Sequence, residues 1–216
     1  REDAAVARLL GGAPAVRPAR STPAPALDWK SLGPYPSRAA SEAAQLLSRP
    51  GADTTVDDHF WDAITSKEPL RLALALRAGA SVGQRRGVTG YTPLVLLAER
   101  CEPDEDAEQQ VSIAEQLIAA GADRTGVDAT GANALVLAAG SCPAGVVQAL
   151  LKAGFAPTSA GPGGDTALKR AISADRADVV ALLLDAGVDP RKEPYNVRAF
   201  ASGRKAIEEL LKRRGR

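Results

Sequence analysis

A short pattern centred on glycine recurs four times along the chain and limits the architectures that this sequence can adopt. The copies are Arg77-Ala78-Gly79-Ala80, Ala119-Ala120-Gly121-Ala122, Lys152-Ala153-Gly154-Phe155 and Asp185-Ala186-Gly187-Val188. Successive glycines are 42, 33 and 33 residues apart. Each glycine follows an apolar run with helical spacing, so each marks the end of a helix. Self-similarity at this period is typical of arrays in which every unit packs against its neighbours.

A second pattern marks where another helix begins in each unit. Thr92, Asn133 and Thr166 follow the first three of these glycines by 12 or 13 residues. Their short polar side chains suit the N-cap position, where an oxygen accepts a hydrogen bond from an unpaired amide of the first turn. The unit is therefore helix, turn, helix, glycine stop and a turn-rich connection.

This unit resembles the ankyrin repeat, whose consensus runs Thr-Pro-Leu, a short helix, a turn, a longer helix and Gly-Ala-Asp. The resemblance covers about residues 40–213 and is best between Thr166 and Asp189. The sequence departs from the family at two kinds of position. Val95, Val136 and Lys169 stand where the family usually has histidine, and Cys101, Cys142 and Asp175 stand where it usually has the turn glycine.

The resemblance implies an all-α ankyrin-repeat solenoid of stacked helix-turn-helix units with degenerate capping repeats. The expected units are residues 38–57, 58–91, 92–132, 133–165 and 166–195, followed by a C-terminal cap at 196–216. Asp58 is the expected helix cap of the divergent second unit. Upstream, residues 1–37 hold a helix-competent start and a Pro/Gly-rich stretch. Because Trp29 and Tyr35 lie in this segment, we expect it to run along the first repeat as an extended strap.

Composition argues against several classes of function. The formal charge is +1, and there are too few aromatic residues for a nucleic-acid platform, so no nucleic-acid partner is expected. The apolar stretches are shorter than the roughly 20 residues of a membrane helix, so no membrane insertion is expected. Two cysteines and one histidine are too few for a convincing zinc site, and no phosphate-binding loop occurs. We therefore predict no metal and no cofactor.

The sequence offers few candidate catalytic residues. His59 lies among Asp57, Asp58 and Asp62, which leaves an enzyme using His59 as a minor alternative. On a helix, however, His59 points about 100° away from Asp58, so the cluster is typical of an acidic first helical turn. We predict no catalytic residue and no enzyme activity.

Ankyrin arrays generally bind other proteins through the turn tips and the inner helix surface, so binding of a protein partner is the implied function. Arginine and tyrosine are enriched at binding hot spots. The expected contact residues are Gln84, Arg85, Arg86, Tyr91, Arg124 and Asp128. The chain is expected to be a monomer when free, with a partner that a neighbouring gene would encode.

Cys101 and Cys142 each follow their helix cap by nine residues, so stacking places them side by side in adjacent repeats. A disulfide needs Cα atoms within about 7 Å, whereas packed helices lie 8 to 10 Å apart, so a bridge would need a local adjustment of the loop. A bridge would indicate a periplasmic or secreted protein, since disulfides persist in oxidising compartments. A leader removed before Arg1 would agree with export, although a trimmed chain explains that start equally well. Two unpaired thiols in the cytoplasm remain the alternative.

Residues 102–110 are an acidic insertion that lengthens this unit by eight residues. These residues either contact a partner or stabilise the helix that follows, since acidic side chains interact favourably with the dipole at a helix start. The bacterial ankyrin proteins that the chain resembles include periplasmic partners of enzymes and immunity proteins that block toxins. Cytoplasmic scaffolds and effectors delivered to host cells are the alternatives.

Overall fold

The computed structural model describes residues 56–87, 90–103 and 105–214. The expected strap and nearly all of the expected first unit lie outside these ranges. The described helices are α3 Val56–Thr65, α4 Pro69–Arg77, α5 Pro93–Arg100, α6 Ala107–Ala119, α7 Ala134–Ser141, α8 Ala144–Lys152, α9 Ala167–Ser173, α10 Ala177–Asp185, α11 Val197–Phe200 and α12 Lys205–Arg214. A small hairpin pairs β1 Ala160–Gly161 with β2 Asp165–Thr166, around the 3-10 turn Pro162–Gly164.

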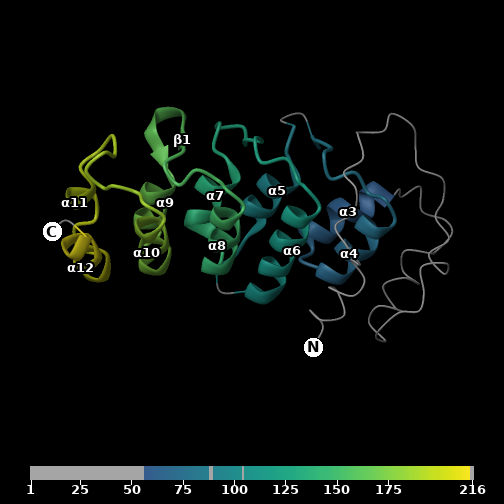
Figure 1. Ribbon diagram of the computed structural model, residues 1–216, viewed down its shortest axis with the longest axis horizontal. Coiled ribbons are helices and arrows are strands. Elements are labelled where there is room, and N and C mark those ends of the chain that lie inside the picture. Colours follow the sequence, from purple (N-terminus) through teal and green to yellow (C-terminus); the bar gives the residue numbers. More distant parts are fainter. Residues whose placement is uncertain (1–55, 88–89, 104, 215–216) are drawn as a thin grey trace.

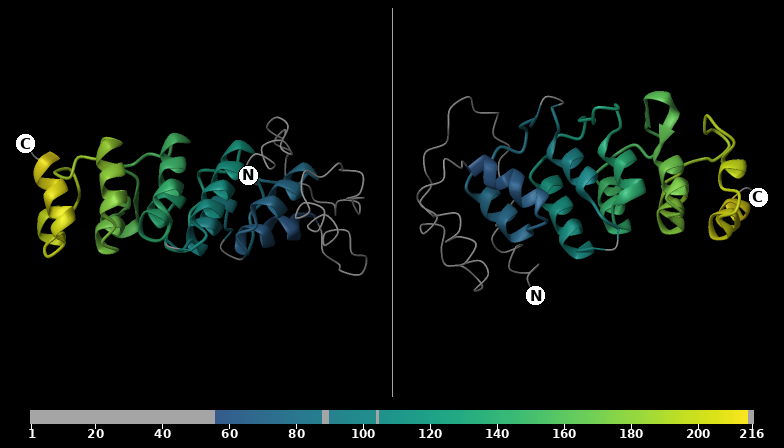
Figure 2. Two further views of the ribbon diagram at one scale, coloured as in Figure 1. Left: turned by 90° about the horizontal axis from the view of Figure 1, so that it is seen from below. Right: turned by 180° about the vertical axis from the view of Figure 1, so that it is seen from behind.

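The helices form two parallel rows that run the length of the molecule (Figure 1). The first helices of the units pack in sequence, α3 on α5, α5 on α7 and α7 on α9. The second helices do the same, α4 on α6, α6 on α8, α8 on α10 and α10 on α12. Figure 2 shows the same row of helix pairs from two further sides. The predicted all-α solenoid of stacked helix-turn-helix units is confirmed.

Glycine ends the second helices as the repeated pattern predicts. After α6, Gly121 has a φ of 78°, a left-handed conformation that favours glycine. The amide of Ala120 donates to the carbonyl of Gln116, and that of Ala122 donates to Leu117, both at 2.9 Å. These bonds satisfy carbonyls that the helix end would otherwise leave unpaired.

The predicted helix caps are confirmed at two of three repeats. Asn133 Oδ1 accepts from the amide of Val136 at 3.0 Å, and Thr166 Oγ1 accepts from Lys169 at 3.1 Å. Thr92 precedes α5 as predicted, but its side chain makes no cap bond and its hydroxyl is buried without a partner.

The predicted cap Asp58 is wrong, because α3 already includes Val56 and Asp58 lies inside the helix. Its neighbour Asp57 reaches out of the helix instead. One carboxylate oxygen of Asp57 accepts from the amide of Ser81 at 2.9 Å. The acidic first turn therefore ties α3 to the connection that follows α4.

Aliphatic side chains build one continuous core between the two rows. Leu183, Ile172, Leu150 and Ile113 are fully buried, and the same cluster extends from Val56 to Leu211. In α3, Phe60 and Trp61 meet edge to face, with ring centroids 5.5 Å apart. Because each helix pair covers its neighbour, the apolar face is buried only in the assembled array.

The acidic insertion is divided between a loop and a helix. Residues 101–106 connect α5 to α6, whereas only Cys142 and Pro143 connect α7 to α8. In addition, α6 has 13 residues where α8 and α10 each have 9, so α6 is about one turn longer. The buried side chain of Gln110 holds the loop, since its Nε2 donates to the carbonyls of Glu102 and Glu105. Its Oε1 accepts from the amide of Glu102 at 3.1 Å.

Candidate protein-interaction surface

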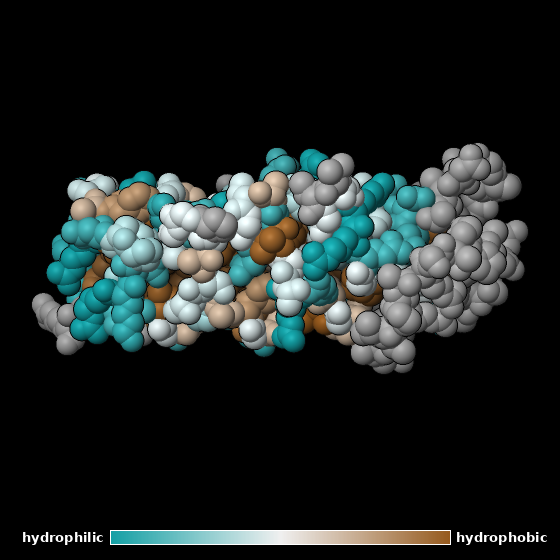
Figure 3. Space-filling view, turned by 90° about the horizontal axis from the view of Figure 1, so that it is seen from above, coloured by the Kyte–Doolittle hydropathy of each residue, from teal (hydrophilic) through white to brown (hydrophobic). Residues whose placement is uncertain are grey.

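Three antiparallel turns project from the same edge of the array, above the row of first helices (Figure 1). We call them the fingers. The first is closed by pairing of Arg86 with Tyr91, the second by pairing of Val127 with Asn133, and the third by the hairpin of β1 and β2. Figure 3 looks onto this edge, where hydrophilic side chains predominate around a few apolar ones.

Four of the six expected contact residues lie in or beside the first finger. Gln84 is half-buried, and its Nε2 donates to Asp57 Oδ2 at 2.6 Å. Tyr91 is half-buried and packs against the core. Arg86 lies with its guanidinium carbon 6.0 Å from the centre of the Trp61 ring and 4.0 Å from an oxygen of Asp58. Gln84 and Tyr91 therefore support the finger, while Arg86 is half-exposed.

Arg85 joins the first finger to the second. Its guanidinium donates to Asp123 Oδ2 at 2.9 Å and keeps a side-chain exposure of 53%. Partial burial of Asp123 opposes ionisation, but hydrogen bonds from Thr125 and the charge of Arg85 outweigh it and lower the pKa of Asp123. The ion pair therefore holds two fingers together and leaves part of Arg85 accessible.

The remaining two expected residues lie in the second finger and have different roles. Arg124 is exposed, and its guanidinium donates to the carbonyl of Ala153 in the next repeat. Asp128 closes the turn, because its Oδ1 accepts from the amides of Thr130 and Ala132 at 2.9 and 2.8 Å. Arg124 thus braces the next unit, whereas Asp128 shapes the finger.

The sequence interpretation missed two residues of this surface. Asp123 is not among the expected contact residues, yet it is the partner of Arg85. Val127 is 41% exposed and is the one large exposed apolar side chain among the described residues. The position of Val127 between Gly126 and Asp128, two residue types common in turns, could have indicated in the sequence that this valine is exposed. A rigid finger with an exposed apolar residue and half-exposed arginines suits contact with another protein.

The two cysteines lie at the opposite ends of the first helices from their caps. Cys101 and Cys142 are joined by a disulfide, with a Cα–Cα distance of 4.7 Å. This distance is shorter than the roughly 8 to 10 Å between the axes of packed helices. The reason is that each cysteine follows the last residue of its helix and has an extended backbone. The ends of α5 and α7 are also close at the residue before Cys142, since Ser141 Oγ donates to the carbonyl of Ala98 at 3.1 Å. Both cysteines are buried.

His59 lies in α3 and contacts a cation. Its Nδ1 is 3.0 Å from an arginine nitrogen of Arg71, and since arginine only donates, Nδ1 accepts. Burial, followed by the charge of Arg71, lowers the pKa of His59, and the opposing charges of Asp62 and Asp58 do not compensate. These contacts fix the ring within the second unit, residues 58–91.

Residues 105–193 match the family model for ankyrin repeats, in three copies. This chain carries ankyrin repeats. The repeats are a protein-protein interaction module, and the matched stretch includes the second and third fingers. Comparison of the sequence with curated proteins gives no match.

Among the residues between 56 and 214 that the structure describes, no three histidine, cysteine or acidic side chains come together as metal ligands would. In the same ranges, no helix combines the length and the apolar character of a membrane span.

Proposed function

We propose that the chain binds one protein partner through the three fingers and the adjacent side of the first helices. The observation that carries this proposal is the brace from Arg85 to Asp123. It links two fingers while leaving a guanidinium half-exposed, and the second of these fingers also carries the exposed Val127. Because Asp123 holds Arg85 and Asp128 closes the turn of the second finger before binding, ordering these residues costs little entropy on association.

We further propose that binding takes place in the periplasm or outside the cell. The buried disulfide supports this, since a bond between Cys101 and Cys142 is stable in an oxidising compartment. A stoichiometric complex without turnover is what an inhibitor or immunity protein of an exported enzyme or toxin requires. A cytoplasmic scaffold or a delivered effector would use the same surface without needing the disulfide.

A photo-crosslinking amino acid at position 127 tests the surface. The full chain carrying it is incubated with a periplasmic extract of the native organism and irradiated. We expect one protein to be captured in a 1:1 product. The matched control places the same amino acid at Glu209, exposed on α12 far from the fingers. Equal capture from both positions would contradict the proposal.

Neutral substitutions then test the arginines with the captured partner. Arg85→Gln with Arg86→Gln should weaken binding about tenfold, because both half-exposed guanidinium groups are lost. Charge reversal is less informative, since an acid at position 85 would face Asp123. Unchanged affinity with an unchanged circular dichroism spectrum would exclude the first finger as a contact site.

A further inference from the structure

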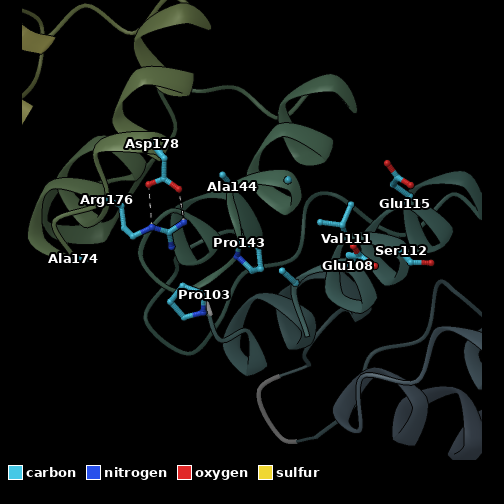
Figure 4. Close-up of a pocket in the computed structure, with 12 residues that line it drawn as sticks. Pro103, Glu108, Val111, Ser112, Glu115, Pro143, Ala144, Ala174, Arg176 and Asp178 are labelled. Atoms are coloured by element: carbon cyan, nitrogen blue, oxygen red, sulfur yellow. Dashed lines mark hydrogen bonds and ion pairs between the residues drawn. The ribbon is translucent and has the colours of Figure 1, made fainter. Parts of the chain in front are cut away.

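A groove of about 800 Å³ lies on the row of second helices, which the fingers do not reach. It spans α6, α8 and the start of α10. Figure 4 shows Glu108 and Ser112 on one side, Pro143 and Ala144 in the middle, and Arg176 and Asp178 on the other side. The groove therefore crosses three consecutive repeats.

The floor of the groove is made of small side chains. Pro143, Ala144 and Gly145 lie at the start of α8, which packs between the longer α6 and α10, a helix of the same length as α8. A Cβ on Gly145 would lie 2.6 Å from Cγ2 of Val111, so glycine lets α8 approach α6 closely. With no long side chain on the floor, the groove stays shallow and open.

The insertion supplies one wall. Its extra helical turn brings Ala107 and Glu108 to the groove, and Pro103 of its loop completes the same side. The disulfide holds this wall beside the floor, because Cys101 lies two residues before Pro103 and Cys142 immediately precedes Pro143. The groove therefore results from the insertion at residues 102–110 and from the disulfide between Cys101 and Cys142, the two features that depart from the repeat pattern.

The charge of the groove is negative. Glu108 and Glu115 are seven residues apart and share one face of α6. Both are exposed, and neither forms an ion pair within the described residues. The one lining cation, Arg176, is already engaged, because it makes two bonds to Asp178 and donates to the carbonyl of Cys142 at 2.8 Å. The ion pair between Arg176 and Asp178 therefore leaves the carboxylates of Glu108 and Glu115 as the two unpaired charges among the described lining residues.

We propose that this groove is a second docking site, for an extended segment of a protein partner that carries lysine or arginine between small residues such as alanine and proline. The basic side chains would pair with Glu108 and Glu115, and the small residues would cover the floor at Ala144 and Gly145. Charge complementarity favours this occupant, and the shallow floor excludes a large aromatic anchor. The site does not depend on the fingers.

Selection of a random dodecapeptide display library against the full, oxidised chain tests the proposal. We expect enriched peptides to carry basic residues next to alanine, proline or glycine. A labelled copy of the best peptide is then titrated by fluorescence polarisation. Glu108→Lys with Glu115→Lys should weaken its binding about tenfold or more, while Glu99→Lys, a single charge reversal on α5 outside the groove, should not.

A second pair of variants separates shape from charge. Ala107→Trp places a bulky side chain at an exposed position of the groove wall and should abolish peptide binding, whereas Ala119→Trp, exposed at the other end of α6, should leave binding unchanged. Circular dichroism verifies that both variants fold. Selection of acidic or aromatic peptides, or peptide binding that neither groove variant reduces, would overturn the proposal. In the groove variants, the crosslinker at position 127 should still capture the partner of the fingers. That result would show that the groove and the fingers are separate binding surfaces.

Discussion

Gly126 of the second finger packs directly against the side chain of Thr92, the residue that precedes α5, and leaves no room for a Cβ. The methyl, hydroxyl and Cβ of Thr92 all lie within the space that an added carbon would occupy. Thr92 is completely buried, and its hydroxyl has no partner among the described residues. The second finger therefore covers the start of α5, the first helix of the same unit.

Gly126→Ala should consequently destabilise the array by about 1–3 kcal/mol through overpacking. The cause is steric, because the stiff, β-branched Thr92 cannot rotate away without losing its packing. Urea unfolding measures the effect. Gly83→Ala is the matched control, since a Cβ there meets nothing within 4 Å, and its midpoint should barely change. Equal midpoints for both variants would show that the finger is not seated on Thr92.

Leu183→Ala should lower the free energy of unfolding by about 2–5 kcal/mol, because it leaves a cavity between stacked helices. Leu183 is fully buried, whereas Leu182 beside it is half-buried. Leu182→Ala should therefore cost clearly less in the same urea titration. An unchanged midpoint for Leu183→Ala would mean that the helix register is wrong.

Reduction of the disulfide should lower the thermal midpoint. On the chain-entropy model, a bond between residues 41 positions apart stabilises the folded chain by about 4 kcal/mol. Cys101→Ser should reproduce the loss and make the midpoint insensitive to reductant. A free-thiol assay on the denatured, unreduced protein is decisive. Two reactive thiols per chain would eliminate the bond and favour a cytoplasmic binding module.

Mild acid should destabilise the second unit, residues 58–91, through His59. Its pKa is lowered from 6.5 in the folded chain, so the unfolded chain binds more protons once the pH falls below about 6.5. Stability is therefore present at pH 7.5 and declines toward pH 5.5. Thermal melts at both pH values should show a smaller difference for His59→Gln. The pKa values of Asp123 and Asp178 are lowered instead, so their contributions are lost only at more acidic pH.

Much of the finger surface could be located from the sequence, but the roles of its residues could not. Turn signals predicted that Arg85, Arg86 and Arg124 lie at the turn tips, whereas Arg86 closes the first finger, and Arg85 and Arg124 precede the closing pairs of the first and second fingers. The partners of Arg85 and Arg124 lie 38 and 29 residues away, at Asp123 and at the carbonyl of Ala153. Such pairings depend on how far one finger is offset from the next, which no local pattern encodes.

The sequence by itself determined the repeat period, the ends of the second helices and the aliphatic core. These follow from interactions within about one helical turn, such as the cap at Asn133 and the glycine stop at Gly121. Only the tertiary structure decided that the insertion lengthens α6, that Cys101 and Cys142 approach to 4.7 Å, and that an acidic groove opens beside them. The reason is that stacking sets the distances between repeats, and those distances decide which side chains of neighbouring units meet.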